Sequence, residues 1–169
     1  MAAYELVAEC VLGRPVPEVF ATFGEARNLE AMTPPWLRFQ ILEPLPVTMA
    51  PGTLIDYRLR LHGIPLRWRT AITAWEPPFR FVDEQVRGPY RSWVHEHTFE
   101  AHGGGTAARD RVRYEVPGGS AVNRFLVAPD LERIFGFRQR VLVERFGGRV
   151  GPVRIGRVAS AGGGAAARP

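Results

Sequence analysis

Two histidines, His95 and His97, are the side chains of this sequence best suited to acid–base chemistry. They belong to an alternating stretch, Trp93-x-His95-x-His97-x-Phe99. Residues two apart in a β-strand project from the same face, so both imidazoles share a face with the two aromatic rings. An imidazole gains or loses a proton near neutral pH, which suits it to act as a base, an acid or a hydrogen-bond partner.

A carboxylate is predicted directly opposite one of these histidines. If residues 102–105 form a hairpin loop, Ala101 faces Thr106, His97 faces Asp110, and Glu96 faces Arg111 as a cross-strand ion pair. A histidine held by a carboxylate could remove a proton next to a carbonyl or protonate a leaving hydroxyl. The candidate catalytic residues are therefore His97, Asp110 and His95. Two other interpretations stay open: a buried His–Asp hydrogen bond that only secures the strand register, and hydrogen bonding to a ligand.

A metal site is a further possibility for the same residues. Two histidines with Asp110 and Asp83 would suit zinc or iron. His-x-His alone is a weak motif, however, so we predict no metal ion and no cofactor. The single cysteine, Cys10, excludes an internal disulfide and a cysteine-based zinc site, and we interpret it as a core residue.

Several further polar and aromatic residues are predicted on the same inner face. In the preceding hairpin, Leu61 opposite Leu66 would align Leu59 with Trp68 and Tyr57 with Thr70. In the next strand, Phe79 and Phe81 pointing inward would carry Asp83 and Gln85 inward too. Burying polar groups costs roughly 1–3 kcal/mol each unless they are paired, which favours a cavity that a ligand enters. The candidate ligand-binding residues are Tyr57, Trp68, Asp83, Gln85, Trp93 and Tyr114.

The elements that must position these residues follow from periodicity and from glycine and proline breaks. A strand over 4–12 precedes two short helices, one beginning near Pro17 and one over 25–32. Further strands are predicted over 36–42, 53–61, 66–75, 79–86, 90–101 and 106–116. A long helix over 130–146 carries an apolar face that must cover the sheet. This order predicts an α+β fold with an antiparallel sheet of seven strands.

Charge and composition limit the classes of function. The chain has 169 residues and a net charge of +5, with arginine as its only strongly basic residue type. Residues 149–169 carry four arginines and no acidic residue, which leaves a net charge of +1 for the rest. We therefore predict one domain over 1–148, a disordered tail over 149–169, and no nucleic-acid partner. No apolar stretch is long enough to span a membrane, no signal peptide is recognisable, and the lone cysteine fits the cytoplasm.

Four arginines, Arg58, Arg60, Arg67 and Arg69, are predicted on the outer face of the first hairpin. Such a cluster could attract an acidic partner. The alternative, which the sequence favours, is a solvated face balanced by Asp56, Glu84 and Glu96 on neighbouring strands.

The order of elements resembles the SRPBCC superfamily, which includes START, polyketide cyclase/dehydrase and pollen-allergen-like proteins, and within it a bacterial stand-alone ligand-binding subgroup. The resemblance covers residues 4–147 and rests on "NLEAMTPPWLRFQIL" at 28–42, the strand-rich segment 49–100, "GGTAARDRVRYEVP" at 104–117 and "DLERIFGFRQRVL" at 130–142. It implies a helix-grip fold, in which a curved sheet wraps around the long C-terminal helix and encloses a hydrophobic cavity.

The function that the resemblance implies is binding of a small hydrophobic molecule, lipid-like or polyketide-like, in that cavity. Two alternatives remain: a cyclase or dehydratase that uses the His–Asp pair, and an interaction module that uses the arginine face. The oligomeric state and the identity of the ligand are not predicted.

Overall fold

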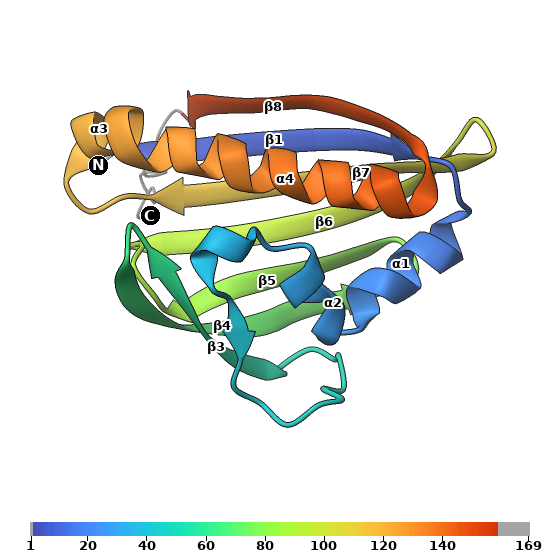
Figure 1. Cartoon of the computed structure of the whole chain (residues 1–169), viewed down its shortest axis with the longest axis horizontal. Coiled ribbons are helices and arrows are strands. Elements are labelled where there is room, and N and C mark those ends of the chain that lie inside the picture. The colour runs from blue at the N-terminus through green and yellow to red at the C-terminus, as the bar shows by residue number, and fades with distance from the viewer. Residues whose placement is uncertain (1, 159–169) are drawn as a thin grey trace, which may run out of the picture.

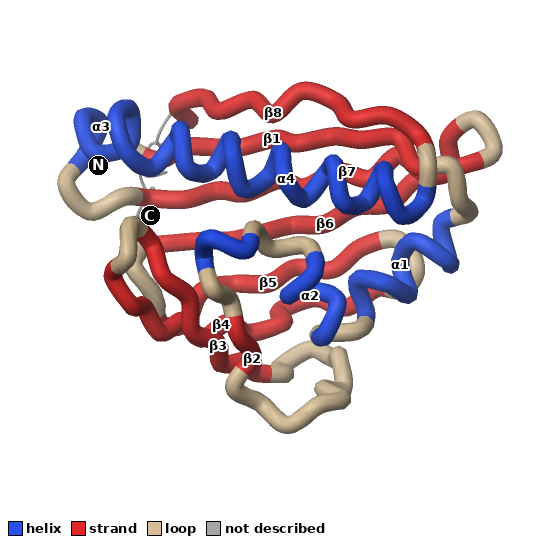
Figure 2. Tube along the Cα trace, in the orientation of Figure 1, coloured by secondary structure: helices blue, strands red, loops and turns tan. Residues whose placement is uncertain are grey.

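The computed structural model describes residues 2–158, which form one antiparallel sheet with the helices on one face (Figure 1; Figure 2). The eight strands are β1 (Ala3–Leu12), β2 (Gln40–Ile41), β3 (Leu54–Leu61), β4 (Ile64–Glu76), β5 (Arg80–Arg87), β6 (Ser92–His102), β7 (Gly105–Glu115) and β8 (Gly148–Val158). They lie in the order β2-β3-β4-β5-β6-β7-β1-β8, and each neighbouring pair among residues 2–158 is antiparallel.

The helical elements are α1 (Val16–Gly24), α2 (Arg27–Ala31), a 3-10 turn η1 (Pro35–Leu37), α3 (Gly119–Val122), a π-helical segment η2 (Asn123–Val127) and the long α4 (Ala128–Phe146). The three predicted helices correspond to α1, α2 and α4. The strand predicted over 36–42 is wrong in its first part, which belongs to η1, and only Gln40–Ile41 forms a strand there. Proline in the first turn starts α1, because a missing N–H costs nothing there. Pro129, which lacks an N–H to donate, lies where the π-helical η2 gives way to α4. In Figure 1, α4 crosses the half of the sheet that contains β1 and β8, and α1 and α2 lie beside it toward β4 and β5. No helix within residues 2–158 is long and apolar enough to cross a membrane.

The hairpin of β6 and β7 has the predicted register. His97 pairs with Asp110, and Glu96 pairs with Arg111. The turn between the strands contains two glycines with positive φ, a conformation that glycine adopts without steric cost. The histidines therefore lie on the face that the alternation indicated.

Part of the strand predicted over 79–86, observed as β5, extends the inner face that carries the histidines. It pairs with β6 so that Phe81 faces His97 and Asp83 faces His95. The prediction that Phe81 and Asp83 point inward with the histidines is confirmed. The same prediction is wrong for Phe79, which lies in the turn before β5 and is 62% exposed.

The register predicted for β3 and β4 is wrong by two residues. Leu61 pairs with Ile64 rather than Leu66, so Tyr57 faces Trp68. The turn contains only His62 and Gly63, whose φ values of 51° and 80° are the positive values that a two-residue hairpin turn requires. A shift by two residues keeps the same side chains on the inner face. The prediction that Tyr57 and Trp68 point inward is therefore unaffected by the register error.

The strand count and the predicted tail need correction. Residues 149–158, expected to be disordered, belong to β8, an edge strand that pairs with β1 and makes the sheet eight-stranded. Pro152 is compatible with this position because an edge strand leaves one row of N–H groups without a ladder partner. Val153 and Ile155 pack against buried residues of the core. The remainder of the predicted tail, residues 159–169, lies outside the described residues.

Candidate functional site

Buried polar side chains separate two hydrophobic clusters between the sheet and α4. His95, His97, Asp110 and Arg138 are each at least nine-tenths buried. One cluster lies toward Phe99 and Leu142, and the other toward Trp93 and Phe135. Each polar residue interrupts an inward-facing apolar run on its own element: Trp93, His95, His97 and Phe99 on β6; Ala108, Asp110 and Val112 on β7; Phe135, Arg138 and Leu142 on α4.

Asp110 holds both imidazoles. Its Oδ1 atom is 2.9 Å from Nε2 of His95 and 2.9 Å from Nδ1 of His97. Its other oxygen, Oδ2, is 3.5 Å from Nε of Arg138. The Arg138 guanidinium also lies over the ring of Phe23, 5.1 Å from its centre, which keeps the charge at this position. The predicted pair of His97 with Asp110 is thus part of a larger cluster.

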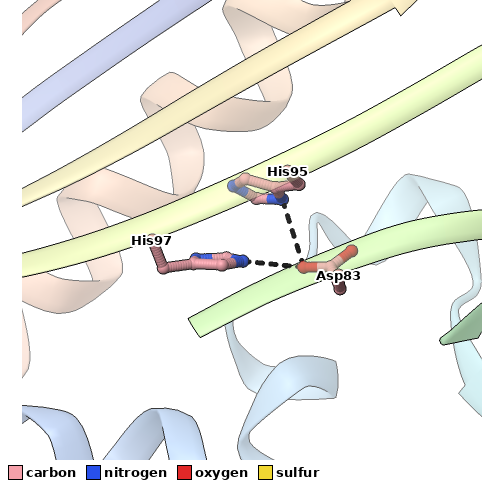
Figure 3. Close-up of side chains that lie close together, drawn as sticks. All are labelled: Asp83, His95 and His97. Carbon is pink, nitrogen blue, oxygen red and sulfur yellow. Dashed lines mark hydrogen bonds and ion pairs between the residues drawn. The ribbon is translucent and has the colours of Figure 1, made fainter. Parts of the chain in front are cut away.

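Asp83 faces the ring nitrogens of His95 and His97 that do not face Asp110, and Figure 3 shows both of its contacts. Its Oδ2 atom is 2.8 Å from Nε2 of His97 and 3.7 Å from Nδ1 of His95. The His97 ring stacks on Phe81 with centroids 3.9 Å apart, and the two imidazole centroids are 3.7 Å apart. The pairing of β5 with β6 therefore fixes both the position and the plane of the His97 ring.

The electrostatics of the cluster favour charged carboxylates and a neutral His95. Burial would raise the pKa of Asp110, but the Arg138 charge and hydrogen bonds from both histidines hold that pKa well below its ordinary value. Burial likewise opposes ionisation of Asp83, and the two histidines outweigh it, so its pKa is lowered. Burial and the neighbouring His97 lower the pKa of His95.

The contacts of His97 would allow this residue to move a proton. Both ring nitrogens of His97 lie within 3 Å of a carboxylate oxygen, so its proton can lie toward Asp83 or toward Asp110. The imidazole can then act as an acid on one side while the carboxylate behind it keeps the ring in place.

A cavity of about 200 Å³ opens beside this cluster. That volume is more than ten times the roughly 10–15 Å³ that a single water requires. Its wall is mainly apolar and comes from α1, α2, α4 and strands β3 to β6. Trp68, which is 8% exposed, also lines it, and its indole Nε1–H has no hydrogen-bond partner among residues 2–158. The cavity thus combines a large apolar surface with the polar cluster on its wall.

Six of the predicted site residues lie on the cavity wall: Tyr57, Trp68, Asp83, Trp93, His95 and His97. Asp110 lies behind the imidazoles, outside the lining, so it contacts the rings and not the cavity space. Its position is that of an orienting carboxylate, whereas Asp83 is the carboxylate exposed to the cavity.

Gln85 and Tyr114 were expected on the cavity wall, and the structure places both elsewhere. The Gln85 amide donates to the carbonyl of Tyr90 at 2.8 Å and accepts from its N–H, so it secures the loop between β5 and β6. The Tyr114 hydroxyl donates to Oδ1 of Asn123 at 3.0 Å inside the core. Each polar group is satisfied by a local partner that strand alternation alone does not reveal.

Arg138 is the residue of the cluster that the sequence analysis missed. It lies on the cavity wall and pairs with Asp110. Its signal is its spacing: Leu131, Phe135, Arg138 and Leu142 follow the i, i+4, i+7, i+11 pattern of the apolar face of α4. A charge at such a position indicates a buried partner.

Two of the four arginines on the outer face are paired with neighbouring strands. Arg58 donates to Oε1 of Gln40 at 2.9 and 2.6 Å, and Arg69 makes two hydrogen bonds to Asp56 at 2.8 and 2.6 Å. Asp56 therefore balances Arg69, as expected. The other two acids expected to balance this face have different partners: Glu84 accepts from Thr73, and Glu96 pairs with Arg80.

Cys10 is buried in the core, as expected. Burial raises the pKa of its thiol to about 12. The reactive form of a cysteine is the thiolate, so this residue is no nucleophile at neutral pH.

Comparisons with known proteins agree with this architecture. The family model described as "Polyketide cyclase / dehydrase and lipid transport" matches residues 12–140. No curated protein matches the sequence.

Solved structures share the fold at low identity. Protein CV1439 from Chromobacterium violaceum has a TM-score of 0.67 and 13% identity, covering 86% of this chain and 99% of that one. Ginseng major latex-like protein 151 from Panax ginseng has a TM-score of 0.62 and 12% identity, covering 85% and 97%. TTHA0849 from Thermus thermophilus has a TM-score of 0.60 and 23% identity, covering 83% and 95%. The likeness is one of fold, the long helix held by a curved antiparallel sheet.

Proposed function

Because the chain belongs to the polyketide cyclase / dehydrase and lipid transport family of the SRPBCC superfamily, we propose that it binds a small hydrophobic molecule. This molecule would be lipid-like or polyketide-like and would lie between the sheet and α4. The observation that carries the proposal is the cavity of about 200 Å³, which is lined by Trp68, a residue whose buried indole N–H has no hydrogen-bond partner within residues 2–158. A buried donor without a partner costs roughly 1–3 kcal/mol, and a carbonyl or hydroxyl oxygen of a ligand would remove that cost. An apolar molecule with at least one oxygen acceptor fits both features.

The test has two parts, and the first is native mass spectrometry of the protein purified from cells. We expect a bound species whose added mass is released under denaturing conditions. The second part uses an anthraquinone and a fluorescent fatty acid as probes, one for each chemical class. Binding of the anthraquinone alone would favour a polyketide-like ligand, and binding of the fatty acid alone a lipid.

Two variants of one strand make a matched pair for this test. Leu59 lines the cavity from β3, whereas Leu54 on the same strand is exposed on the outer face. Leu59→Trp should fill the cavity and abolish probe binding, and Leu54→Trp should leave it unchanged. Equal binding by both variants, or no probe binding by the parent protein, would contradict the proposal.

A second candidate function is acid–base catalysis on the bound molecule, as in a cyclase or dehydratase. The observation that favours it is His97, which lies on the cavity wall between two carboxylates. His97 would exchange a proton with the ligand, Asp83 would face the reacting atoms beside it, and Asp110 would position both imidazoles. His95 would share the proton network through Asp110.

Catalysis is separated from binding by comparing turnover with affinity. His97→Ala and Asp110→Asn should abolish conversion of a polyketide substrate while the affinity for that substrate changes little. If both variants merely unfold at a lower temperature and convert substrate normally when folded, the cluster has a structural role and the catalytic candidate fails.

A further inference from the structure

We propose that Asp83, His95 and His97 form a binding site for one divalent transition-metal ion, Zn²⁺ or Fe²⁺, on the wall of the cavity. One ligand atom from each residue can be chosen so that all three lie within 4.8 Å of one another. Two nitrogen donors and one carboxylate are a donor set that both ions accept. The proposal goes beyond ligand binding by the cavity and does not depend on it. It departs from the expectation of no metal ion, which rested on the weakness of His-x-His as a motif.

The two separations that involve Asp83 lie close to those expected of ligands that share an ion. Two atoms that each lie about 2.1 Å from an ion are about 3.0–3.4 Å apart at angles between octahedral and tetrahedral. Asp83 Oδ2 is 2.8 Å from Nε2 of His97 and 3.7 Å from Nδ1 of His95, on either side of that range. Figure 3 shows both contacts, and a displacement of a few tenths of an ångström in the Asp83 carboxylate would bring both separations into that range.

Asp110 supplies a second and independent indication. Metal-binding histidines usually donate their other ring N–H to a carboxylate, which fixes the tautomer and the plane of the ring. Asp110 Oδ1 lies 2.9 Å from Nε2 of His95 and 2.9 Å from Nδ1 of His97. Arg138 Nη2 lies 3.4 Å from the same His97 Nδ1, farther away than Asp110. If both rings donate to Asp110, His97 Nε2 and His95 Nδ1 are free to bind an ion beside Asp83. One buried carboxylate thus prepares both imidazoles as metal ligands.

Charge and access favour the same site. Asp83 and Asp110 bring two negative charges into the buried cluster, and Arg138, on the side of Asp110, brings one strongly basic group. A divalent cation beside Asp83 would be attracted by the remaining negative charge. Asp83, His95 and His97 all line the cavity, while Asp110 does not. Three protein ligands would leave coordination positions open to the cavity, where an oxygen atom of a bound molecule could reach the ion.

The experiment uses the full chain without an affinity tag, stripped of metal by a chelator. Titration with Co²⁺, a spectroscopic substitute for Zn²⁺, should give visible absorption bands that saturate at one equivalent. Calorimetry with Zn²⁺ and, under anaerobic conditions, with Fe²⁺ then compares the two ions. Asp83→Asn and His95→Gln should abolish saturable binding, and Asp110→Asn should weaken it about 10- to 100-fold.

His62→Gln is the matched control, because it removes a histidine that also pairs with an aspartate. His62 Nε2 lies 2.6 Å from Asp130 Oδ2 at the surface, away from the three proposed ligands. This variant should bind the ion as tightly as the parent protein.

The proposal is overturned if the parent binds no equivalent of any of the three ions, or if Asp83→Asn, folded by circular dichroism, binds as tightly as the parent. Should Asp83→Asn fail to fold, folded His95→Gln decides by the same criterion. No hydrophobic probe is used, so a negative result leaves the cavity proposal standing.

Discussion

Nε2 of His97 lies 2.8 Å from Oδ2 of Asp83, and both residues line the cavity. The other nitrogen of the ring faces Asp110 at 2.9 Å. His97 thus joins an accessible carboxylate on β5 to an enclosed one on β7. Any chemistry at the cavity wall would involve Asp83 directly and Asp110 through the ring.

Replacing the enclosed carboxylate should destabilise the protein strongly. Asp110→Asn removes the charge that faces Arg138, and both side chains are about nine-tenths buried. Breaking a buried ion pair typically costs about 3–5 kcal/mol, because the remaining charge loses its partner. We expect a loss near the lower end of that range in urea unfolding at pH 7.5. Adding Arg138→Met should recover part of it, since the unpaired charge is then gone; simple additivity of the two losses would contradict this explanation.

Acidification should lower the free energy of unfolding in two stages. The pKa of His95 is lowered in the folded state, so the unfolded chain takes up this proton first. The contribution of His95 to the free energy of unfolding is therefore complete above about pH 6.5 and declines as the pH falls below that value. The pKa values of Asp83 and Asp110 are also lowered, so their contributions are present above about pH 4 and are lost below it. Urea midpoints between pH 8 and pH 3 measure both stages. His95→Gln should remove the first stage and weaken the second, because His95 helps to hold the pKa values of Asp83 and Asp110 low.

Removing the indole N–H of Trp68 should weaken ligand binding, even when an aromatic ring is kept at this position. Trp68→Phe deletes the Nε1 donor, which faces no acceptor among residues 2–158. One hydrogen bond contributes about 1 kcal/mol, which corresponds to about a fivefold loss of affinity. Titration with the anthraquinone probe measures the change. Trp36→Phe, at a tryptophan that is 55% exposed and outside the cavity lining, should bind as the parent does.

Side chains of β8 that face the core should contribute to stability. Ile155 packs against the cluster beside α4, whereas its neighbour Arg154 is exposed. Ile155→Ser should lower the free energy of unfolding by about 1–2 kcal/mol, because it removes a partly buried apolar side chain. Arg154→Ser should change it by less than about 0.5 kcal/mol. Thermal unfolding of the two variants compares them; an equal effect would mean that β8 contributes nothing through its inner face.

Local patterns explain why much of the sheet was predictable. The alternation around His95 and His97, the glycine turn after β6 and the cross-strand pair of Glu96 with Arg111 all agree on one register. The hairpin of β3 and β4 was misaligned because His62 adopts a positive φ, which is uncommon for residues other than glycine. The eighth strand was missed because glycine and proline interrupt the alternation of 149–158, which an edge strand tolerates.

Sequence alone thus determined the α+β class, the order of the main elements up to α4 and the face on which His95, His97 and Asp110 lie, because strand alternation and hairpin turns are local properties of the chain. Only the tertiary structure decided which groups meet across elements. Arg138 approaches Asp110 from α4, and Gln85 and Tyr114 turn to partners outside the cavity. Such contacts depend on how the helix lies across the sheet and on side-chain rotamers. Neither of these produces a periodic pattern in the sequence.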